Sequence, residues 1–297
     1  MTITLRGELT KHRAISSDGW GIGALRTDQG THVITGALVN VRVGDHVEVT
    51  GAWFDHPRFG KQIKVKSCTP IRQDGPNGAV KWMASRFPDV GERRAREMAE
   101  HFGEELWQVI AISPERLTEI KGITEERALA INAAYRKYAD EREHMITLRG
   151  WGLTDGQVAR CIEVWGELAE VIVSLRANPY LLGQEVHGFG FLRSDEVAKR
   201  MGVKNDAPER LKAGVEHLLE EAGTQGHCYM SGAALQKMAA ELMAVDANIV
   251  GPAIRAAADA GRLVRRGWRI YTRRMDYAEQ ELADGIKRLL EPERKAA

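Results

Sequence analysis

The stretch 178-NPYLLGQEVHGFGFLRSDEVAKRMG-202 decides the interpretation of this chain. Two glycines, Gly188 and Gly190, stand among apolar residues at its centre, and a segment of helical periodicity follows them. Glycine tolerates positive φ and lets a ligand approach the backbone closely. Where such a turn opens a helix, free N–H groups and the positive dipole end favour an anion. The pattern is therefore typical of a helix-hairpin-helix that binds a phosphate, although it also fits a tight turn between two packed helices.

Three other segments repeat the pattern of a glycine turn that enters a helix. They are residues 88–95 (PDVGERRA), 120–128 (IKGITEERA) and 149–156 (RGWGLTDG). Thr124 and Thr154 are predicted to cap the helices that follow. The repetition predicts a tandem helix-hairpin-helix domain over residues 75–204. Its candidate DNA-binding residues are Gly91, Arg93, Arg94, Lys121, Gly122, Thr124, Arg127, Gly188, Gly190, Arg193 and Lys199. Backbone amides and basic side chains contact phosphates, so we expect binding that is independent of base sequence.

Helices in this domain are expected near residues 78–86, 92–102, 104–111, 114–119, 125–139, 155–165 and 167–175. The last hairpin, at 186–193, is expected to be the strongest phosphate clamp. Its helix would begin near Arg193 or Ser194, with Arg193 adding a charge-assisted hydrogen bond and Lys199 a further charge. In the alternative interpretation, Phe189 and Phe191 drive helix packing and the glycines only make room.

Residues 1–74 have the pattern of a small β-barrel. Five short strand-like runs, at 3–5, 21–25, 32–35, 46–50 and 62–66, are separated by turn residues, which is typical of an OB-type barrel. The segment 51–62 is aromatic and basic together, and Trp53, His56, Arg58 and Phe59 are candidate contacts to a single strand of DNA. The alternative is that Trp53 and Phe59 belong to the barrel core.

Residues 205–275 change character again and predict a winged-helix-like domain. Helices near 207–222 and 231–243 precede a third that starts at Asp246 or Asn248 and stops at Gly261. Strands at 263–265 and 268–271 then flank a turn at 266–267. Residues 255–274 contain seven arginines and one acidic residue, Asp259. This local positive charge makes Arg265 and Arg266 candidate DNA-binding residues. The alternative is a solvated basic face that meets an acidic domain. Residues 276–297 form a last helix and a tail.

The composition of the 297 residues limits the function classes. The net charge is only +1, so a nucleic-acid ligand must be argued from local charge. Three scattered cysteines suggest a reducing cytoplasm rather than disulfides. The sequence contains no apolar run long enough to span a membrane, no signal peptide, no HExxH metal motif and no GxSxG motif. We therefore expect no membrane partner and assign no metal, cofactor or catalytic residue.

Several stretches resemble the N-terminal region of RecD-like ATP-dependent DNA helicases. Residues 51–62, GAWFDHPRFGKQ, resemble the GxWxxHPxYGxQ segment of the family's barrel, with Phe59 where tyrosine is usual. NPY at 178–180, GFG at 188–190 and DEVA at 195–198 resemble its hairpin motifs. GHCY at 226–229 resembles the start of its winged helix, and IY at 270–271 and YAE at 277–279 resemble the segment that leads to its motor.

The resemblance implies a multidomain α+β protein that handles DNA in repair or recombination. The family's motor begins with GxxxxGK followed by Ser or Thr, and this sequence has no such stretch, because Gly60 and Lys61 are followed by Gln62. We therefore expect no ATP hydrolysis by this chain, and a motor would stand on a separate chain or in a longer protein. Two alternatives remain, a hairpin-type nuclease or glycosylase that uses Asp195 or Glu196, and a protein–protein adaptor for a separate motor.

Overall fold

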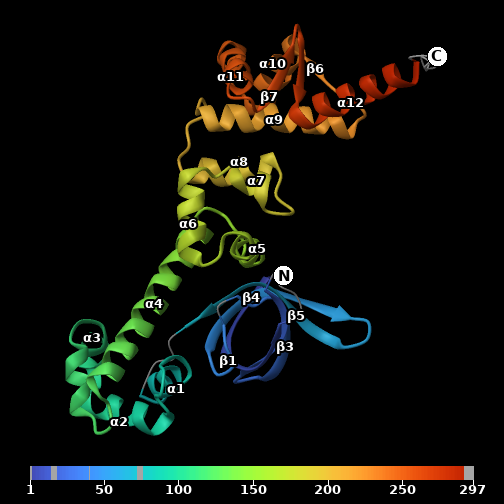
Figure 1. Cartoon of the computed structure of the whole chain (residues 1–297). Coiled ribbons are helices and arrows are strands. Elements are labelled where there is room, and N and C mark those ends of the chain that lie inside the picture. Colours follow the sequence, from blue (N-terminus) through green and yellow to red (C-terminus); the bar gives the residue numbers. More distant parts are fainter. Residues whose placement is uncertain (1, 15–18, 40, 72–75, 291–297) are drawn as a thin grey trace, which may run out of the picture. The chain divides into compact units, whose positions relative to one another are not determined.

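The computed structural model describes residues 2–14, 19–39, 41–71 and 76–290. It divides into two compact units, Met1–Ser174 and Leu175–Ala297. The first unit contains a barrel and three hairpins, and the second contains the fourth hairpin and the C-terminal helices. Each unit is described separately (Figure 1).

The first unit begins with a closed barrel of five strands. Its strands are β1 (Thr2–Ala14), β2 (Trp20–Thr27), β3 (Gly30–Ala37), β4 (His46–His56) and β5 (Gly60–Pro70). They close in the order β1-β2-β3-β5-β4, with β1 pairing β4 and with β3 and β5 parallel. Alternate apolar side chains fill the interior, among them Leu9, Leu25, Ile34, Val49 and Ile63. The predicted OB-type barrel is confirmed, and each predicted strand lies inside an observed, longer one.

A helical part follows the barrel in the same unit. It consists of α1 (Pro76–Arg86), α2 (Glu92–Phe102), η1 (Gly103–Glu105), α3 (Leu106–Ile112), η2 (Pro114–Glu119), α4 (Glu125–Gly150), α5 (Asp155–Trp165) and α6 (Leu168–Ala177), whose last residues enter the second unit. Trp82, Met83, Met98, Ile110 and Ile131 are buried in its core. The prediction that a helix covers 125–139 is too short, because α4 has 26 residues. Its charged second half lacks apolar periodicity but has no helix-breaking residue before Gly150.

Among the described residues, the second unit combines the fourth hairpin with four further helices and a small sheet. Its elements are α7 (Leu181–Glu185), α8 (Phe191–Arg200), α9 (Pro208–Thr224), β6 (Met230–Ser231), α10 (Gly232–Met243), α11 (Ala247–Asp259), β7 (Leu263–Arg266), β8 (Arg269–Thr272) and α12 (Arg273–Leu290). The strands pair in the order β6-β8-β7. One core holds Tyr180 and Phe191 of the hairpin together with Leu218, Val250 and Ile270.

Two predicted boundaries in this unit are wrong. Helix α8 begins at Phe191, with Gly190 as its N-cap, rather than near Arg193 or Ser194. The Ser194 hydroxyl donates to the carbonyl of Gly190 at 3.0 Å, inside the first helical turn. The turn between β7 and β8 consists of Gly267 and Trp268, one residue later than predicted, because Arg266 pairs with Arg269. This shift moves Trp268 out of the strand and into the turn.

Candidate nucleic-acid interface

All four predicted hairpins have a turn residue with positive φ before the helix. These residues are Asp89, Gly122, Gly152 and Gly188, with φ of 55°, 88°, 89° and 82°. The next residue is buried in every case, and the helix N-cap follows it, at Gly91, Thr124, Thr154 and Gly190. The four segments therefore share one local geometry, which confirms the helix-hairpin-helix prediction.

The first hairpin uses its glycine differently from the sequence prediction. The sequence predicts Gly91 as the turn residue, but its φ of −80° and ψ of 170° are ordinary extended values. The positive φ belongs to Asp89, a residue type that tolerates this conformation better than most. Gly91 is instead the N-cap of α2, and a Cβ added there would meet nothing within 4 Å. The open space leaves the first amides of α2 accessible to a ligand.

An arginine stands five residues after the turn residue in three of the hairpins. Arg94 donates to the carbonyl of Asp89, and Arg127 donates to the carbonyl of Gly122 at 2.8 Å. Arg193 has the same position after Gly188, whereas the third hairpin has Gln157 there. In the first two hairpins this bond holds a guanidinium beside the helix N-terminus, where a bound phosphate would accept from both.

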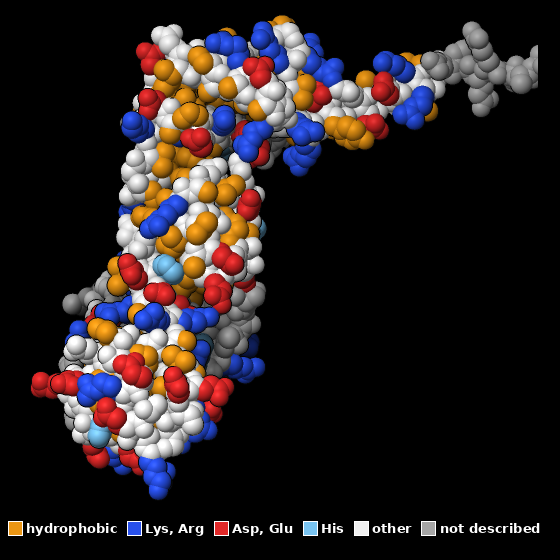
Figure 2. All heavy atoms as spheres, turned by 60° about the vertical axis from the view of Figure 1, so that its left-hand side comes forward, with side chains coloured by type: hydrophobic (Ala, Val, Ile, Leu, Met, Phe, Trp, Pro, Cys, Tyr) orange, Lys and Arg blue, Asp and Glu red, His pale blue; other side chains and the backbone are white. Residues whose placement is uncertain are grey.

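The first and second hairpins lie close together. A Cβ added at Gly122 would be 3.5 Å from a terminal nitrogen of Arg94. The exposed Lys121 belongs to the same turn, and the Thr124 hydroxyl accepts from the amide of Arg127 at 3.4 Å, as predicted for a cap. Arg93 is exposed and lies 3.6 Å from the carboxylate of Glu97. Two adjacent turns thus bring several cations to one place, although basic and acidic side chains are interspersed over the face that Figure 2 shows.

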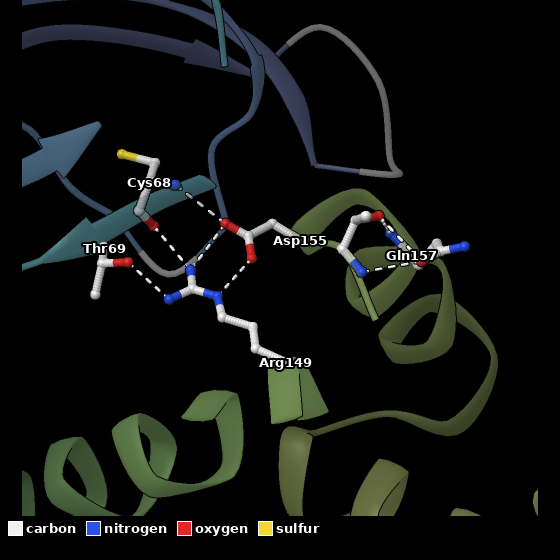
Figure 3. Close-up of polar contacts among 6 residues, drawn as sticks. Cys68, Thr69, Arg149, Asp155 and Gln157 are labelled. Atoms are coloured by element: carbon white, nitrogen blue, oxygen red, sulfur yellow. Dashed lines mark hydrogen bonds and ion pairs between the residues drawn. The ribbon is translucent and has the colours of Figure 1, made fainter. Parts of the chain in front are cut away.

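The helix that follows the third turn contacts the barrel at its first residue (Figure 3). Asp155, the first residue of α5, is 2% exposed and receives two hydrogen bonds of 2.8 Å from Arg149. Its carboxylate also accepts from the amide of Cys68 on β5 at 3.1 Å. Arg149 in turn donates to the Thr69 hydroxyl at 2.7 Å and to the Cys68 carbonyl at 3.3 Å. We name this arrangement of Arg149, Asp155, Cys68 and Thr69 the clasp.

The clasp shows how the barrel is fixed to the helical part of the unit. Thr154 caps α5 as predicted and forms a capping box with Gln157, so the local hairpin is intact. A second buried pair, Arg86 on α1 with Asp45 of the barrel, fixes another point. Burial, and then the Asp155 carboxylate, raises the pKa of the Cys68 thiol to about 12. The first residue of α5 is therefore buried against the barrel, while its N-cap Thr154 stays exposed.

The fourth hairpin has a less basic surrounding than its sequence suggests. Gly188 and Gly190 are exposed, and a Cβ at Gly190 would meet nothing within 4 Å. Arg193 forms an ion pair with Glu196, and Lys199 pairs with Asp195 at 2.9 Å. A groove next to Gly190 is also lined by the acidic residues Glu216 and Glu220 and by the basic residues Arg262 and Arg273. The role of this hairpin as the strongest clamp remains a prediction, and these carboxylates weaken it.

Asp195 is the centre of a buried network instead of an open catalytic carboxylate. It accepts from the Tyr180 hydroxyl at 2.9 Å and from Arg210, itself 1% exposed, at 2.7 and 3.0 Å. Burial acts to raise the pKa of this carboxyl, but hydrogen bonds from Arg210, Lys199 and Tyr180 outweigh it and hold the pKa below its ordinary value. The network fixes α8 to α9 and to the NPY segment.

The aromatic and basic residues of the barrel lie at its surface. Trp53 is 37% exposed and Phe59 71% exposed, so neither ring is in the barrel core. The His56 and Phe59 rings are 4.8 Å apart at the tip of the β4–β5 hairpin, and the Arg58 amide donates to His56 Nδ1 at 3.1 Å. Exposed rings next to cations suit base stacking and phosphate pairing.

Sequence reasoning missed two neighbours of Trp53. His32 meets its ring edge-on at 5.4 Å, and Lys61 Nζ lies 4.8 Å from its ring centroid. Lys61 belongs to the quoted 51–62 segment, so its basic charge was a usable signal. His32 lies on β3, and only the barrel closure brings it to Trp53.

The two arginines predicted to bind DNA beside the β7–β8 turn have different partners. Arg265 donates to the carbonyl of Gly267 at 3.1 Å, within the turn. Arg266 forms an ion pair with Asp276 on α12 and is therefore partly neutralised. The missed neighbours are Tyr229, Trp268 and Arg269, whose side chains group together.

Neither a cluster of metal-binding side chains nor a membrane-spanning helix occurs among the described residues. In this part of the chain, no group of three or more His, Cys, Asp or Glu side chains could hold a metal ion. No helix of residues 2–14, 19–39, 41–71 and 76–290 has the length and apolar character needed to cross a membrane.

Comparisons with known proteins match two regions of the chain, the barrel and the second half of the hairpin domain. Residues 5–72 match the model of the OB-fold domain of the ATP-dependent DNA helicase YrrC, and residues 136–229 match that of the HHH domain of the ATP-dependent RecD2 DNA helicase. The chain is 26% identical over 306 aligned positions to the ATP-dependent RecD2 DNA helicase of Deinococcus radiodurans. The alignment covers 96% of this chain and 42% of that relative.

The second match contains the third and fourth hairpins, while the first two are recognised by their geometry. The barrel, the hairpins and the similarity over 96% of this chain together confirm that the chain resembles the N-terminal region of the RecD-like DNA helicases.

Proposed function

We propose that the chain is a sequence-independent DNA-binding module that acts as the front end of a RecD-like helicase. The observation that carries this proposal is the pair of adjacent hairpins at residues 88–94 and 120–127. Each has an open helix N-terminus with an arginine, Arg94 or Arg127, bonded back to its turn carbonyl. Amides and guanidinium groups would bind phosphates, which carry no base identity.

The other two domains extend this proposed interface. The barrel surface with Trp53, Phe59 and Lys61 would take a single strand, because every base has a face that can stack on a ring. The helices α9, α10 and α11 with the β6-β8-β7 sheet support a winged-helix domain, and its arginines would contact the duplex. A module with separate contacts for duplex and for single strand suits a junction between the two.

The cellular setting follows from the relatives by analogy. The chain spans 42% of the Deinococcus radiodurans helicase, so ATP-driven unwinding is part of the proposal only through a motor, in the same longer protein or on a separate chain. A role in DNA repair or recombination and a cytoplasmic location belong to the same proposal.

Salt-dependent binding tests the main proposal. Affinities for two labelled DNA duplexes of unrelated sequence are measured by fluorescence anisotropy across a salt series. We expect equal affinities and a slope of log K against log salt of about −0.9 for each phosphate that is neutralised. A flat salt response, or a strong preference for one sequence, would contradict the proposal.

A protein–protein adaptor is the second candidate, and α12 favours it. Leu282, Ile286 and Leu289 lie on one face of this helix and are 65%, 48% and 86% exposed. Figure 2 shows hydrophobic side chains on the C-terminal helix beside basic ones. Such a stripe would normally be covered by another apolar surface. If a Leu282→Glu change abolishes binding of a purified helicase motor but leaves DNA affinity intact, the adaptor role is supported.

A further inference from the structure

The turn between β7 and β8 carries a group of contacting aromatic and basic side chains to which the proposed function assigns no role. Trp268 occupies the second position of the two-residue turn and is 59% exposed. The Arg269 guanidinium lies 5.1 Å from the Trp268 ring and 4.9 Å from the Tyr229 ring. The two rings meet edge-on at 5.5 Å. We name these three residues the wing platform.

The platform is anchored from behind. The Tyr229 ring lies 5.3 Å from that of Tyr271, which is only 1% exposed. The Trp268 carbonyl accepts from the amide of Gly232 at 2.9 Å, which fixes the turn to the start of α10. A tryptophan whose backbone is fixed while its ring is exposed loses little conformational freedom when a flat ligand stacks on it.

A groove beside the platform carries positive charge. Trp268 and Arg265 line it together with Arg255 of α11, and its one acidic lining residue is Asp259. Arg262 and Arg266 are paired with Glu216 and Asp276. In the described part of the chain, the remaining arginines between residues 255 and 274 make no ion pair with a carboxylate; they are Arg255, Arg265, Arg269, Arg273 and Arg274.

This combination favours a nucleic acid over a protein partner. A protein surface that stacks on Trp268 would also have to neutralise several arginines, whereas a nucleotide brings a flat base and a phosphate at once. Arginine and tryptophan together are the side chains that stack bases in single-strand sites. Phosphates next to the base would lie near Arg255 and Arg265, which line the same groove as Trp268.

We propose that the wing platform stacks the first unpaired nucleobase at the end of a DNA duplex. The groove with Arg255 and Arg265 binds the adjoining phosphates, so the second unit recognises the point where duplex becomes single strand. The inference rests on the proposed function, because it names the DNA structure that one part of the module recognises. It adds a ligand, an unpaired base, and three residues, Tyr229, Trp268 and Arg269, that the phosphate contacts do not require.

The test compares a blunt duplex with the same duplex carrying a short unpaired arm, using the full chain. The first unpaired position holds 2-aminopurine, whose fluorescence reports stacking. We expect Trp268→Ala to weaken binding of the armed duplex roughly tenfold, as for loss of one base–aromatic stack, and to leave blunt-duplex affinity unchanged. Quenching of the 2-aminopurine by the wild-type chain should be lost in Trp268→Ala and retained in Trp268→Phe. Tyr277→Ala, which removes a 66% exposed ring from α12 of the same unit, is the matched control and should change nothing.

The outcomes separate the two proposals. If the wild-type chain binds both DNAs but Trp268→Ala changes neither affinity nor quenching, the platform does not bind a base, and a protein partner becomes its expected occupant. An equal loss for both duplexes would also overturn the inference, since the ring would then act without an unpaired base. If the wild-type chain binds neither DNA, the proposed function fails and this inference fails with it.

Discussion

The second and third hairpins have the same turn and opposite surroundings. Gly122 and Gly152 have almost equal φ, and Thr124 and Thr154 cap the helices that follow. After the second turn come Arg127 and an exposed helix N-terminus. After the third come Asp155 and Gln157, and the Asp155 carboxylate is buried against the barrel. One motif therefore offers an anion site in one place and a domain contact in the other.

The difference shows that the turn alone does not define a phosphate site. The turn and cap set the direction of the helix N-terminus, and the residue at the third helical position and the neighbouring barrel decide what that N-terminus can meet. An arginine at the third position adds a cation for phosphate. Both first positions are acidic, Glu125 and Asp155, but only Asp155 is buried, where it accepts from Arg149 and from the Cys68 amide.

Breaking the clasp should give the largest effect. Arg149→Leu leaves the Asp155 carboxylate buried without its cation, and we expect the free energy of unfolding to fall by about 3 kcal/mol. Denaturant unfolding measures the loss. Lys137→Ala is the matched control, because Lys137 lies on the same helix as Arg149 and its exposed ion pair with Glu167, at 3.0 Å, should contribute under about 1 kcal/mol. Equal effects of the two changes would show that the clasp does not hold the barrel.

Removing the repeated arginines should weaken DNA binding next most strongly. For the double change Arg94→Ala and Arg127→Ala we expect a loss of about 2–3 kcal/mol in binding free energy, from two charged hydrogen bonds with partial compensation. The magnitude of the salt slope should fall by about 0.9 for each phosphate that the variant no longer neutralises. Arg136→Ala, on the same long helix but away from the turn, is the control, and melting temperatures check the fold. Unchanged affinity in the double variant would remove these hairpins from the interface.

The barrel surface should contribute a smaller share, limited to single strands. Phe59→Ala removes one exposed ring, so the affinity for single-stranded DNA should fall by about 1–2 kcal/mol, within the range for one base stack. Arg58→Ala should add a salt-dependent loss. Val43→Ala, a 53% exposed aliphatic side chain of the barrel, serves as control. If both barrel variants bind single strands as the wild type does, the site lies elsewhere.

The fourth hairpin should give the smallest effect. Arg193 and Lys199 are paired with Glu196 and Asp195, so removing both cations should cost under about 1 kcal/mol of DNA affinity. The sequence alone favours this hairpin as the strongest clamp. A loss above about 2 kcal/mol, with an unchanged melting temperature, would restore that view and show that DNA displaces the carboxylates.

Features set by neighbouring residues could be predicted from the sequence. The barrel strands, three of the four turns and the Thr124 and Thr154 caps depend on local conformational preferences, and they lie where expected. The sequence prediction missed Asp89 because Gly91, two residues later, is the residue type that more readily adopts positive φ. The one-residue shift that exposes Trp268 depends on strand register, which the two-residue turn fixes.

Contacts between distant segments could not be predicted. Asp155 meets the Cys68 amide across 87 positions of the chain, and nothing in RGWGLTDG indicates that the barrel would occupy this helix start. Arg210 likewise reaches Asp195 and Tyr180 only through the packing of α9 on α8. The absence of an arginine at position 157 was the one local sign that the third hairpin differs.

Amide hydrogen exchange with and without duplex DNA tests most directly that only open hairpins bind phosphate. The account predicts that DNA slows exchange at residues 91–94 and 122–127. Exchange at residues 154–158 should stay equally slow in both samples, because the clasp and the capping box already hold this helix start. Slowing by DNA at 154–158, with no change at 122–127, would contradict it.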